Sequence, residues 1–274
     1  MHAYIEVERG VRIYVEEIGQ GKPVLFIHGW PINHKMYEYQ INVLPHYGYR
    51  CIRVDLRGFG KSDAPWQGYN YNRMADDIRI VVEALRIENA TLVGFSMGGA
   101  IAIRYITRHA AYRMSLLILA SAAAPSFIQR PDFPYGLPRE EVNALIASTY
   151  VDRPKMVDDF GKNFFASSIS EPFRSWFNGL GVEASSIGTI RGLEALRDED
   201  LRGDLPYVQL PTTILYGMLD KICPYPLAEL LHRGIQHSRI VPFGHSGHGV
   251  FYDELEKFNG ELLTALNRVT AKPY

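Results

Sequence analysis

Short apolar runs alternate with amphipathic stretches along most of this chain. The runs that fit a buried strand occupy residues 23–27, 49–54, 90–93, 114–120, 212–216 and 238–243. Between two of them, residues 78–85 repeat apolar side chains at helical spacing. Runs without a polar face are typical of parallel strands covered by helices on both sides. We therefore predict an α/β fold with a mostly parallel, doubly wound sheet and right-handed crossovers.

Weaker patterns indicate the remaining elements. Residues 4–7 and 11–17 predict two strands that are joined at Gly10 in a tight hairpin. Further helices are expected over residues 35–44, 100–106, 226–233 and 255–266. Asn72 is the expected N-cap of the helix that contains residues 78–85, because an asparagine side chain accepts hydrogen bonds from the first amides of a helix.

The alternation of strands and helices stops between Ala122 and Leu205. This segment contains many prolines and short helical patterns, and Val157, Phe160 and Phe164 share one helical face within it. It is too long and too apolar for an ordinary loop. We interpret residues 122–205 as a helical cap, or lid, inserted over the sheet, with 1–121 and 206–274 forming the α/β core.

Composition limits the classes of protein that remain. The 274 residues are 47% apolar, and 29 basic against 30 acidic residues leave a net charge of −1. Such a chain can bury a large core as one elaborated domain. Near-neutral charge without a basic cluster argues against nucleic acid or an anionic membrane as the partner.

The cysteine content, the amino-terminal sequence and the length of the apolar runs indicate the cellular compartment. Two cysteines, Cys51 and Cys223, cannot form a disulfide scaffold for this length, and both are expected to be small buried residues. The charged, alternating amino terminus is unlike a signal peptide. No apolar run approaches the ~20 residues that cross a bilayer. We expect a cytoplasmic protein, with homo-oligomers possible.

The strongest chemical signal is Gly94-Phe95-Ser96-Met97-Gly98, a G-x-S-x-G frame between a predicted strand and a predicted helix. A strand that turns sharply into a helix needs small neighbours at its apex and holds the serine out above the sheet. A helix amino terminus beside that serine favours negative charge. The passive alternative is an ordinary glycine-rich turn.

A serine nucleophile needs a base and an orienting acid. His248 follows the last strand in a glycine-flanked loop, and the order serine, aspartate, histidine places the base there, with His245 as the alternative. Asp220 ends a buried strand that lies between Ser96 and His248 in the sequence, and it is the expected acid. The alternative is an aspartate that only caps the following turn. His28, Asp55 and Ser121 also end predicted strands, so we expect them at the same edge.

Acyl transfer also requires donors for a tetrahedral oxyanion. The backbone N–H of Met97, directly after the serine, is one candidate. The second is the N–H of Trp30 in the loop after an earlier strand, where Pro31 restricts the backbone of its neighbour.

The chain resembles the α/β-hydrolase fold over nearly its whole length. It is most similar to the branch of cofactor-free haloperoxidases and aryl esterases, also called serine perhydrolases. The residues that carry the resemblance are His28-Gly29-Trp30-Pro31, Asp55-Leu56-Arg57-Gly58-Phe59-Gly60-Lys61-Ser62, Gly94-Phe95-Ser96-Met97-Gly98-Gly99, Gly217-Met218-Leu219-Asp220 and His248-Gly249.

The resemblance implies a serine carboxylesterase that acts on small esters through an acyl-enzyme. It implies Ser96, Asp220 and His248 as the triad, oxyanion donors at Trp30 and Met97, and neither a metal nor an organic cofactor. In some members hydrogen peroxide replaces water and gives peracids. The residues expected to line the substrate pocket are Trp30, Phe127, Phe160, Phe164, Trp176 and Ile222.

Other members of the fold provide the alternatives. Dehalogenases and epoxide hydrolases use an aspartate nucleophile, which Ser96 argues against. A lactonase stays open because a lactone is a cyclic ester. A C–C bond hydrolase or an aminopeptidase would keep the triad but would need charged recognition groups that the cap does not reveal. A non-enzymatic ligand receptor is the alternative from a different class.

Overall fold

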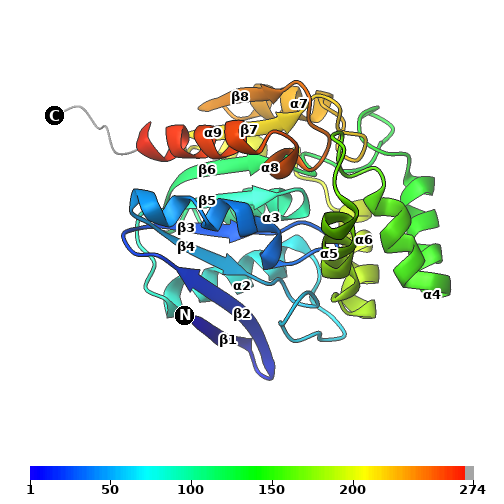
Figure 1. Cartoon of the computed structure of the whole chain (residues 1–274), viewed down its shortest axis with the longest axis horizontal. Helices are drawn as coiled ribbons and strands as arrows, with labels where there is room; N and C mark the ends of the chain where they lie inside the picture. Colours follow the sequence, from blue (N-terminus) through cyan, green and yellow to red (C-terminus); the bar gives the residue numbers. More distant parts are fainter. Residues whose placement is uncertain (269–274) are drawn as a thin grey trace.

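The computed structural model describes residues 1–268 and contains a single eight-stranded sheet (Figure 1). Its strand order is β1-β2-β4-β3-β5-β6-β7-β8. β1 and β2 form the antiparallel hairpin, β2 pairs antiparallel with β4, and all later pairs are parallel. The strands are β1 His2–Glu8, β2 Val11–Ile18, β3 Lys22–Ile27, β4 Tyr49–Val54, β5 Ala90–Phe95, β6 Met114–Ala120, β7 Thr212–Gly217 and β8 Ser238–Phe243. The predicted mostly parallel α/β sheet is confirmed.

The register brings the carboxyl ends of the parallel strands to one edge. Ile27, the last residue of β3, pairs with Val54 of β4 and with Gly94 of β5. On the other side, Phe95 of β5 pairs with Ala120 of β6. Residues that directly follow these strands therefore meet at one edge, which is where ligands bind in such sheets.

Helices cover both faces of the sheet. In Figure 1, α2 (Tyr71–Ala84) and α3 (Met97–Arg108) lie behind the strands, and α9 (Leu255–Arg268) lies in front with α1 (Glu38–Ile41). α7 (Pro226–Gly234) connects β7 to β8, and α8 (Val250–Asp253) precedes α9. No helix in residues 1–268 is long and apolar enough to span a membrane.

Two helix predictions are wrong in detail. The N-cap of α2 is Asn70, whose side chain accepts a hydrogen bond from the Arg73 N–H at 2.8 Å. Asn72 lies inside the first turn, where its side chain accepts from Arg104 instead. The expected helix over residues 35–44 is three short turns, namely η1 His34–Tyr37, α1 Glu38–Ile41 and η2 Leu44–Tyr47. Pro45 at the start of η2 has no N–H with which to continue the preceding turn.

Three helices lie between β6 and β7, beyond the edge toward which the parallel strands point (Figure 1). They are α4 Arg139–Gly161, α5 Glu171–Val182 and α6 Ser186–Asp198, and the short η3 Leu205–Tyr207 leads back to the sheet. α4 bends at Asp152, whose backbone is non-helical, with Pro154 just beyond it. The division into a core (1–121 and 206–274) and a cap (122–205) stays a prediction, and residues 269–274 lie outside the described part of the chain.

Candidate active site

Ser96 lies at the apex of a tight turn between β5 and α3. Its backbone adopts φ 52° and ψ −120°, and the side chain is largely buried. A Cβ on Gly94 would lie 2.5 Å from the Gly98 carbonyl oxygen, and one on Gly98 would collide with the carbonyl oxygens of Ile27 and His28. Both glycines of the G-x-S-x-G frame are therefore required by backbone contact. This is the strained elbow geometry that presents a side chain at the end of a strand.

The backbone of neighbouring strands fixes this turn. The Ser96 N–H donates to the Ala120 carbonyl at 3.0 Å, and the Ser96 carbonyl accepts from the Ala123 N–H at 3.0 Å. The Gly99 N–H also donates to the Ser96 carbonyl, at 2.9 Å. Such over-determined bonding is what allows a strained residue to persist.

His248 and Asp220 meet at the same edge. His248 Nδ1 lies 2.8 Å from Asp220 Oδ2, and both side chains are buried. A carboxylate only accepts, so Nδ1 carries the proton. The other carboxylate oxygen, Oδ1, accepts from the backbone N–H groups of Ile222 at 2.9 Å and Cys223 at 2.8 Å. His245 is exposed and makes no such contact, so the structure brings His248, and not the alternative His245, to the carboxylate.

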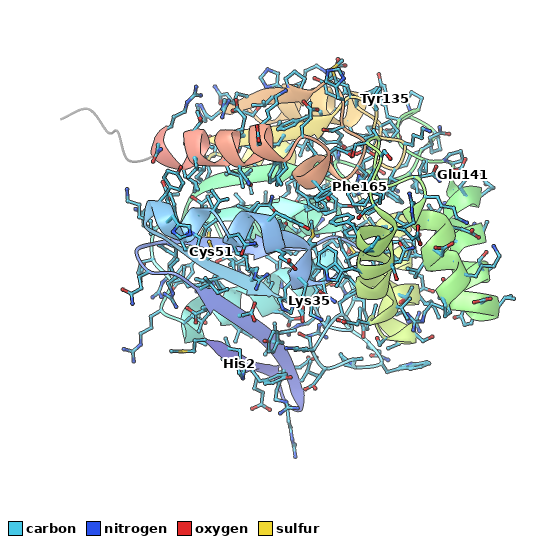
Figure 2. The ribbon with its side chains drawn as sticks, in the orientation of Figure 1. His2, Lys35, Cys51, Tyr135, Glu141 and Phe165 are labelled. Carbon is cyan, nitrogen blue, oxygen red and sulfur yellow. The ribbon has the colours of Figure 1, made fainter. Side chains whose placement is uncertain are left out.

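The loop that carries His248 is held from two directions. The Gly247 N–H donates to Asp253 Oδ2 at 2.8 Å, and Asp253 also accepts from the backbone of Ala166 and Ser167 at 2.9 Å each. The Gly249 N–H donates to the Phe164 carbonyl at 2.8 Å. In Figure 2, the labelled Phe165 lies where this segment meets α8. The histidine loop is therefore tied to the stretch between α4 and α5.

The loop of residues 28–34 passes directly beside Ser96. A Cβ on Gly29 would lie 2.9 Å from the Ser96 Cβ, so only glycine permits this approach. Within residues 1–268, the backbone N–H groups of Trp30 and Met97 have no hydrogen-bond acceptor. An oxyanion site needs unpaired donors of this kind beside the nucleophile, and that role for these two amides stays a prediction.

Side chains at several points anchor this loop. The Leu56 N–H donates to His28 Nε2 at 3.0 Å, and His28 Nδ1 contacts the Gly29 carbonyl at 2.8 Å. Burial lowers the pKa of His28 to about 4, so its imidazole is neutral near pH 7. Trp30 Nε1 donates to the Thr189 carbonyl of α6 at 2.9 Å, and Asn33 Nδ2 donates to Glu183 after α5 at 2.8 Å.

The six expected pocket residues are distributed unequally. Phe160 and Phe164 line a small apolar cavity of about 10 Å³ between this loop, α4 and α5; Pro31, Ile32, Val157 and Phe177 also contribute. Trp30 packs edge-on against Phe160, with ring centroids 5.0 Å apart.

The other four expected pocket residues, Trp30 among them, lie outside the lining of this cavity. Phe127 is buried in the segment after β6, Trp176 packs against Phe173 at 5.4 Å, and Ile222 is buried beside Asp220.

Cys223 is a neighbour of Ser96 that the sequence reasoning treated only as a buried residue. Burial raises the pKa of its thiol well above the usual range, and the negative charge of Asp220 raises it further. Cys223 is free, buried and three residues after Asp220. That proximity to the expected acid was the one signal available in the sequence.

No group of three or more His, Cys, Asp or Glu side chains in residues 1–268 is arranged to hold a metal ion. The arrangement at the carboxyl edge contains a serine at a strained elbow, a buried histidine–aspartate pair and two free backbone amides. These are the groups expected at the site of a serine hydrolase on an α/β sheet.

Comparison with known proteins agrees with that class. The family model described as alpha/beta hydrolase fold matches residues 22–140. An AB hydrolase superfamily protein, YisY of Bacillus subtilis (strain 168), is 53% identical over 259 residues, 94% of this chain and 97% of that protein. The chain belongs to the α/β-hydrolase superfamily.

Two further relatives define the branch. An esterase from Exiguobacterium antarcticum superposes with a TM-score of 0.96 at 50% identity, covering 99% of this chain and 100% of that one. The non-heme chloroperoxidase CPO-A1 of Kitasatospora aureofaciens is 31% identical over 272 residues, 94% of this chain and 97% of that protein. The chain fits the cofactor-free haloperoxidase and esterase branch, and these relatives support a hydrolase enzyme.

Proposed function

We propose that the protein is a serine carboxylesterase that hydrolyses small carboxylic esters through an acyl-enzyme. The observation that carries the proposal is the buried His248–Asp220 hydrogen bond of 2.8 Å at the same sheet edge as the Ser96 elbow. In the proposal, Ser96 is the nucleophile, His248 the base and Asp220 the acid that orients it. The relative described as an esterase supports this class of substrate.

The reaction begins with proton transfer. Ser96 Oγ attacks the ester carbonyl carbon while its proton passes to His248 Nε2, and Asp220 stabilises the imidazolium that forms. No hydrogen bond joins Ser96 Oγ to His248 among the described residues. Catalytic hydrogen bonds often tighten only when substrate is bound. The former carbonyl oxygen becomes an oxyanion, which the Trp30 and Met97 amides stabilise.

The intermediate then collapses. The C–O bond to the alcohol breaks, His248 gives its proton to the departing oxygen, and the acyl group stays on Ser96. A water molecule attacks the acyl carbon, His248 takes its proton, and the acid leaves as the proton returns to Ser96 Oγ. All of these proton movements use the one nitrogen of His248 that faces away from Asp220.

The surroundings of the site favour a small, apolar substrate. The rings of Phe95 and Phe164 lie 4.8 and 4.9 Å from the His248 ring. The neighbouring cavity has apolar walls and a volume of only about 10 Å³. Short acyl chains require the least displacement of these side chains, so we expect activity to fall as the acyl chain lengthens.

The direct test is hydrolysis of p-nitrophenyl acetate by Ser96→Ala. We expect a loss of at least about 10³-fold in kcat, because the nucleophile is removed. Ser121→Ala is a matched control, since Ser121 ends the neighbouring strand, is fully buried and has no hydrogen-bond partner for its hydroxyl among the described residues. It should turn over at the wild-type rate. Wild-type turnover by Ser96→Ala would refute the assignment.

A second activity, perhydrolysis, is favoured by the His28-Gly29-Trp30-Pro31 motif and by the chloroperoxidase relative. Hydrogen peroxide would attack the acyl-enzyme in place of water, giving a peracid and free Ser96. We expect wild type to form peracetic acid from acetate and peroxide, measured by oxidation of a halide or a dye, and Ser96→Ala to form none. Absence of peracid from active wild-type enzyme would remove this activity from the proposal.

A further inference from the structure

A second buried histidine–aspartate pair lies on the opposite side of Ser96 and has no part in the proton transfers above. Asp55 directly follows β4, and His34 ends the loop of residues 28–34. Their side chains are almost completely buried, at 0% and 2% exposure. Neither residue lines the apolar cavity beside Phe160. Burying a carboxylate costs folding free energy unless its oxygens are hydrogen-bonded. The contacts of this pair therefore indicate its role.

Asp55 accepts hydrogen bonds from both the backbone and the side chain of His34. Its Oδ1 accepts from the His34 backbone N–H at 2.8 Å and from His34 Nδ1 at 2.7 Å. Its Oδ2 accepts from the Lys61 N–H at 2.8 Å. Burial acts to raise the pKa of Asp55, but the hydrogen bond and charge of His34 outweigh it and hold that pKa below the usual range. The carboxylate therefore stays ionised at neutral pH.

The outer side of His34 is also occupied. Its Nε2 lies 3.8 Å from Glu16 Oε2, and its carbonyl accepts from Arg53 Nη1 at 3.3 Å. Arg53 forms an ion pair with the same Glu16. The imidazole is thus fixed between two carboxylates and has no open nitrogen toward the site.

We propose that the His34–Asp55 pair is a positioning device that holds the Trp30 amide in register with Ser96. His28 fixes the start of the loop to the Leu56 N–H, and His34 fixes its end to Asp55, the residue before Leu56. The unpaired N–H of Trp30 lies between these two attachments. An oxyanion donor must lie within about 2.7–3.1 Å of the developing charge, so the orientation of this loop sets the rate.

This inference rests on the proposed esterase function, and its test uses two substitutions at one position. His34→Asn keeps an amide N–H close to the place of Nδ1 and should still bind Asp55. His34→Leu fills a similar volume without a donor. We expect His34→Leu to lower kcat for p-nitrophenyl acetate roughly 10- to 100-fold, below the ~10²–10³ for loss of a whole oxyanion donor. KM should change by less than about threefold, and His34→Asn should recover most of the lost kcat.

Three further measurements separate positioning from a merely structural role. Active-site titration with diethyl p-nitrophenyl phosphate gives the fraction of competent enzyme, and the rate of that phosphorylation should fall in parallel with kcat, because it also needs the oxyanion donors. Asp77→Asn breaks a different buried ion pair, which joins Asp77 of α2 to Arg57. It should lower the melting temperature without changing kcat per titrated site. If His34→Leu does not fold, His34→Ala replaces it, since alanine has no side-chain donor for Asp55.

The possible outcomes are distinct. Unchanged kcat per titrated site in His34→Leu, or equal losses in His34→Asn and His34→Leu, would overturn the positioning role. If Ser96→Ala abolishes turnover while His34→Leu does not reduce it, only this inference fails. If Ser96→Ala retains turnover, the esterase mechanism fails and the positioning role fails with it.

Discussion

The His248–Asp220 and His34–Asp55 pairs are nearly identical in local geometry. The Nδ1–carboxylate distances are 2.8 and 2.7 Å, and all four side chains are buried. Each aspartate directly follows a buried strand or its terminal turn, and each carboxylate accepts hydrogen bonds from backbone N–H groups. Burial and a short hydrogen bond therefore do not by themselves identify a catalytic histidine.

The two pairs differ at the second imidazole nitrogen. His248 Nε2 has no hydrogen-bond partner among the described residues, and the ring packs against both Phe95 and Phe164, which also contact each other. His34 Nε2 faces Glu16, 3.8 Å away. A proton carrier must exchange a proton through one nitrogen while the other is held. Only His248 meets that condition, and His34 is suited to fixing a loop.

Removal of each histidine of the last loop tests this distinction most strongly. His248→Ala should lower kcat for p-nitrophenyl acetate by at least about 10³-fold, because Ser96 loses its base. His245→Ala should leave kcat unchanged, since His245 is exposed and contributes its backbone N–H, not its ring, to Glu254 at 2.9 Å. Steady-state kinetics on both variants is sufficient. A collapse in His245→Ala with normal turnover in His248→Ala would move the base to the other position.

The sheet and its carboxyl edge followed from local patterns. Runs such as residues 23–27 and 114–120 have no polar face, so their burial and parallel pairing could be predicted without tertiary information. The placement of Asp220 and His248 followed from the same rule, because each comes after a strand. Their catalytic roles stay predictions until variants are measured.

The elements that could not be predicted depend on contacts between distant segments. The His34–Asp55 contact joins residues 21 apart; Asp55 was expected at the carboxyl edge, but no local pattern pairs it with His34. The misplaced N-cap at Asn72 has the same cause, since an asparagine at either of two positions satisfies the local signal and only Asn70 has the required extended backbone. In the cap, Phe160 and Trp176 are equally aromatic, and helix packing alone decides which reaches the cavity.

His28 is a third buried histidine at this edge, and no carboxylate is hydrogen-bonded to it among the described residues. Its expected effect is a smaller one, on the dependence of stability on pH. Among the described residues its ring is hydrogen-bonded to the Gly29 carbonyl and the Leu56 N–H alone. Burial lowers its pKa from 6.5 to about 4, so between these values the unfolded chain binds a proton that the folded chain does not. Stability from this residue is therefore complete above pH 6.5 and is lost as the pH falls toward 4, by at most about 1.4 kcal/mol per pH unit.

Urea unfolding at pH 7, 6 and 5 measures this contribution. The free energy of unfolding should fall with pH in wild type, and His28→Asn should flatten that slope even though it is less stable at pH 7. His46→Asn is the control, because His46 is exposed and should leave the slope unchanged. Equal slopes in wild type and His28→Asn would show that His28 does not stay neutral in the fold. In that case the Leu56 N–H could not donate to a protonated Nε2, and the loop would lose its first attachment beside Ser96.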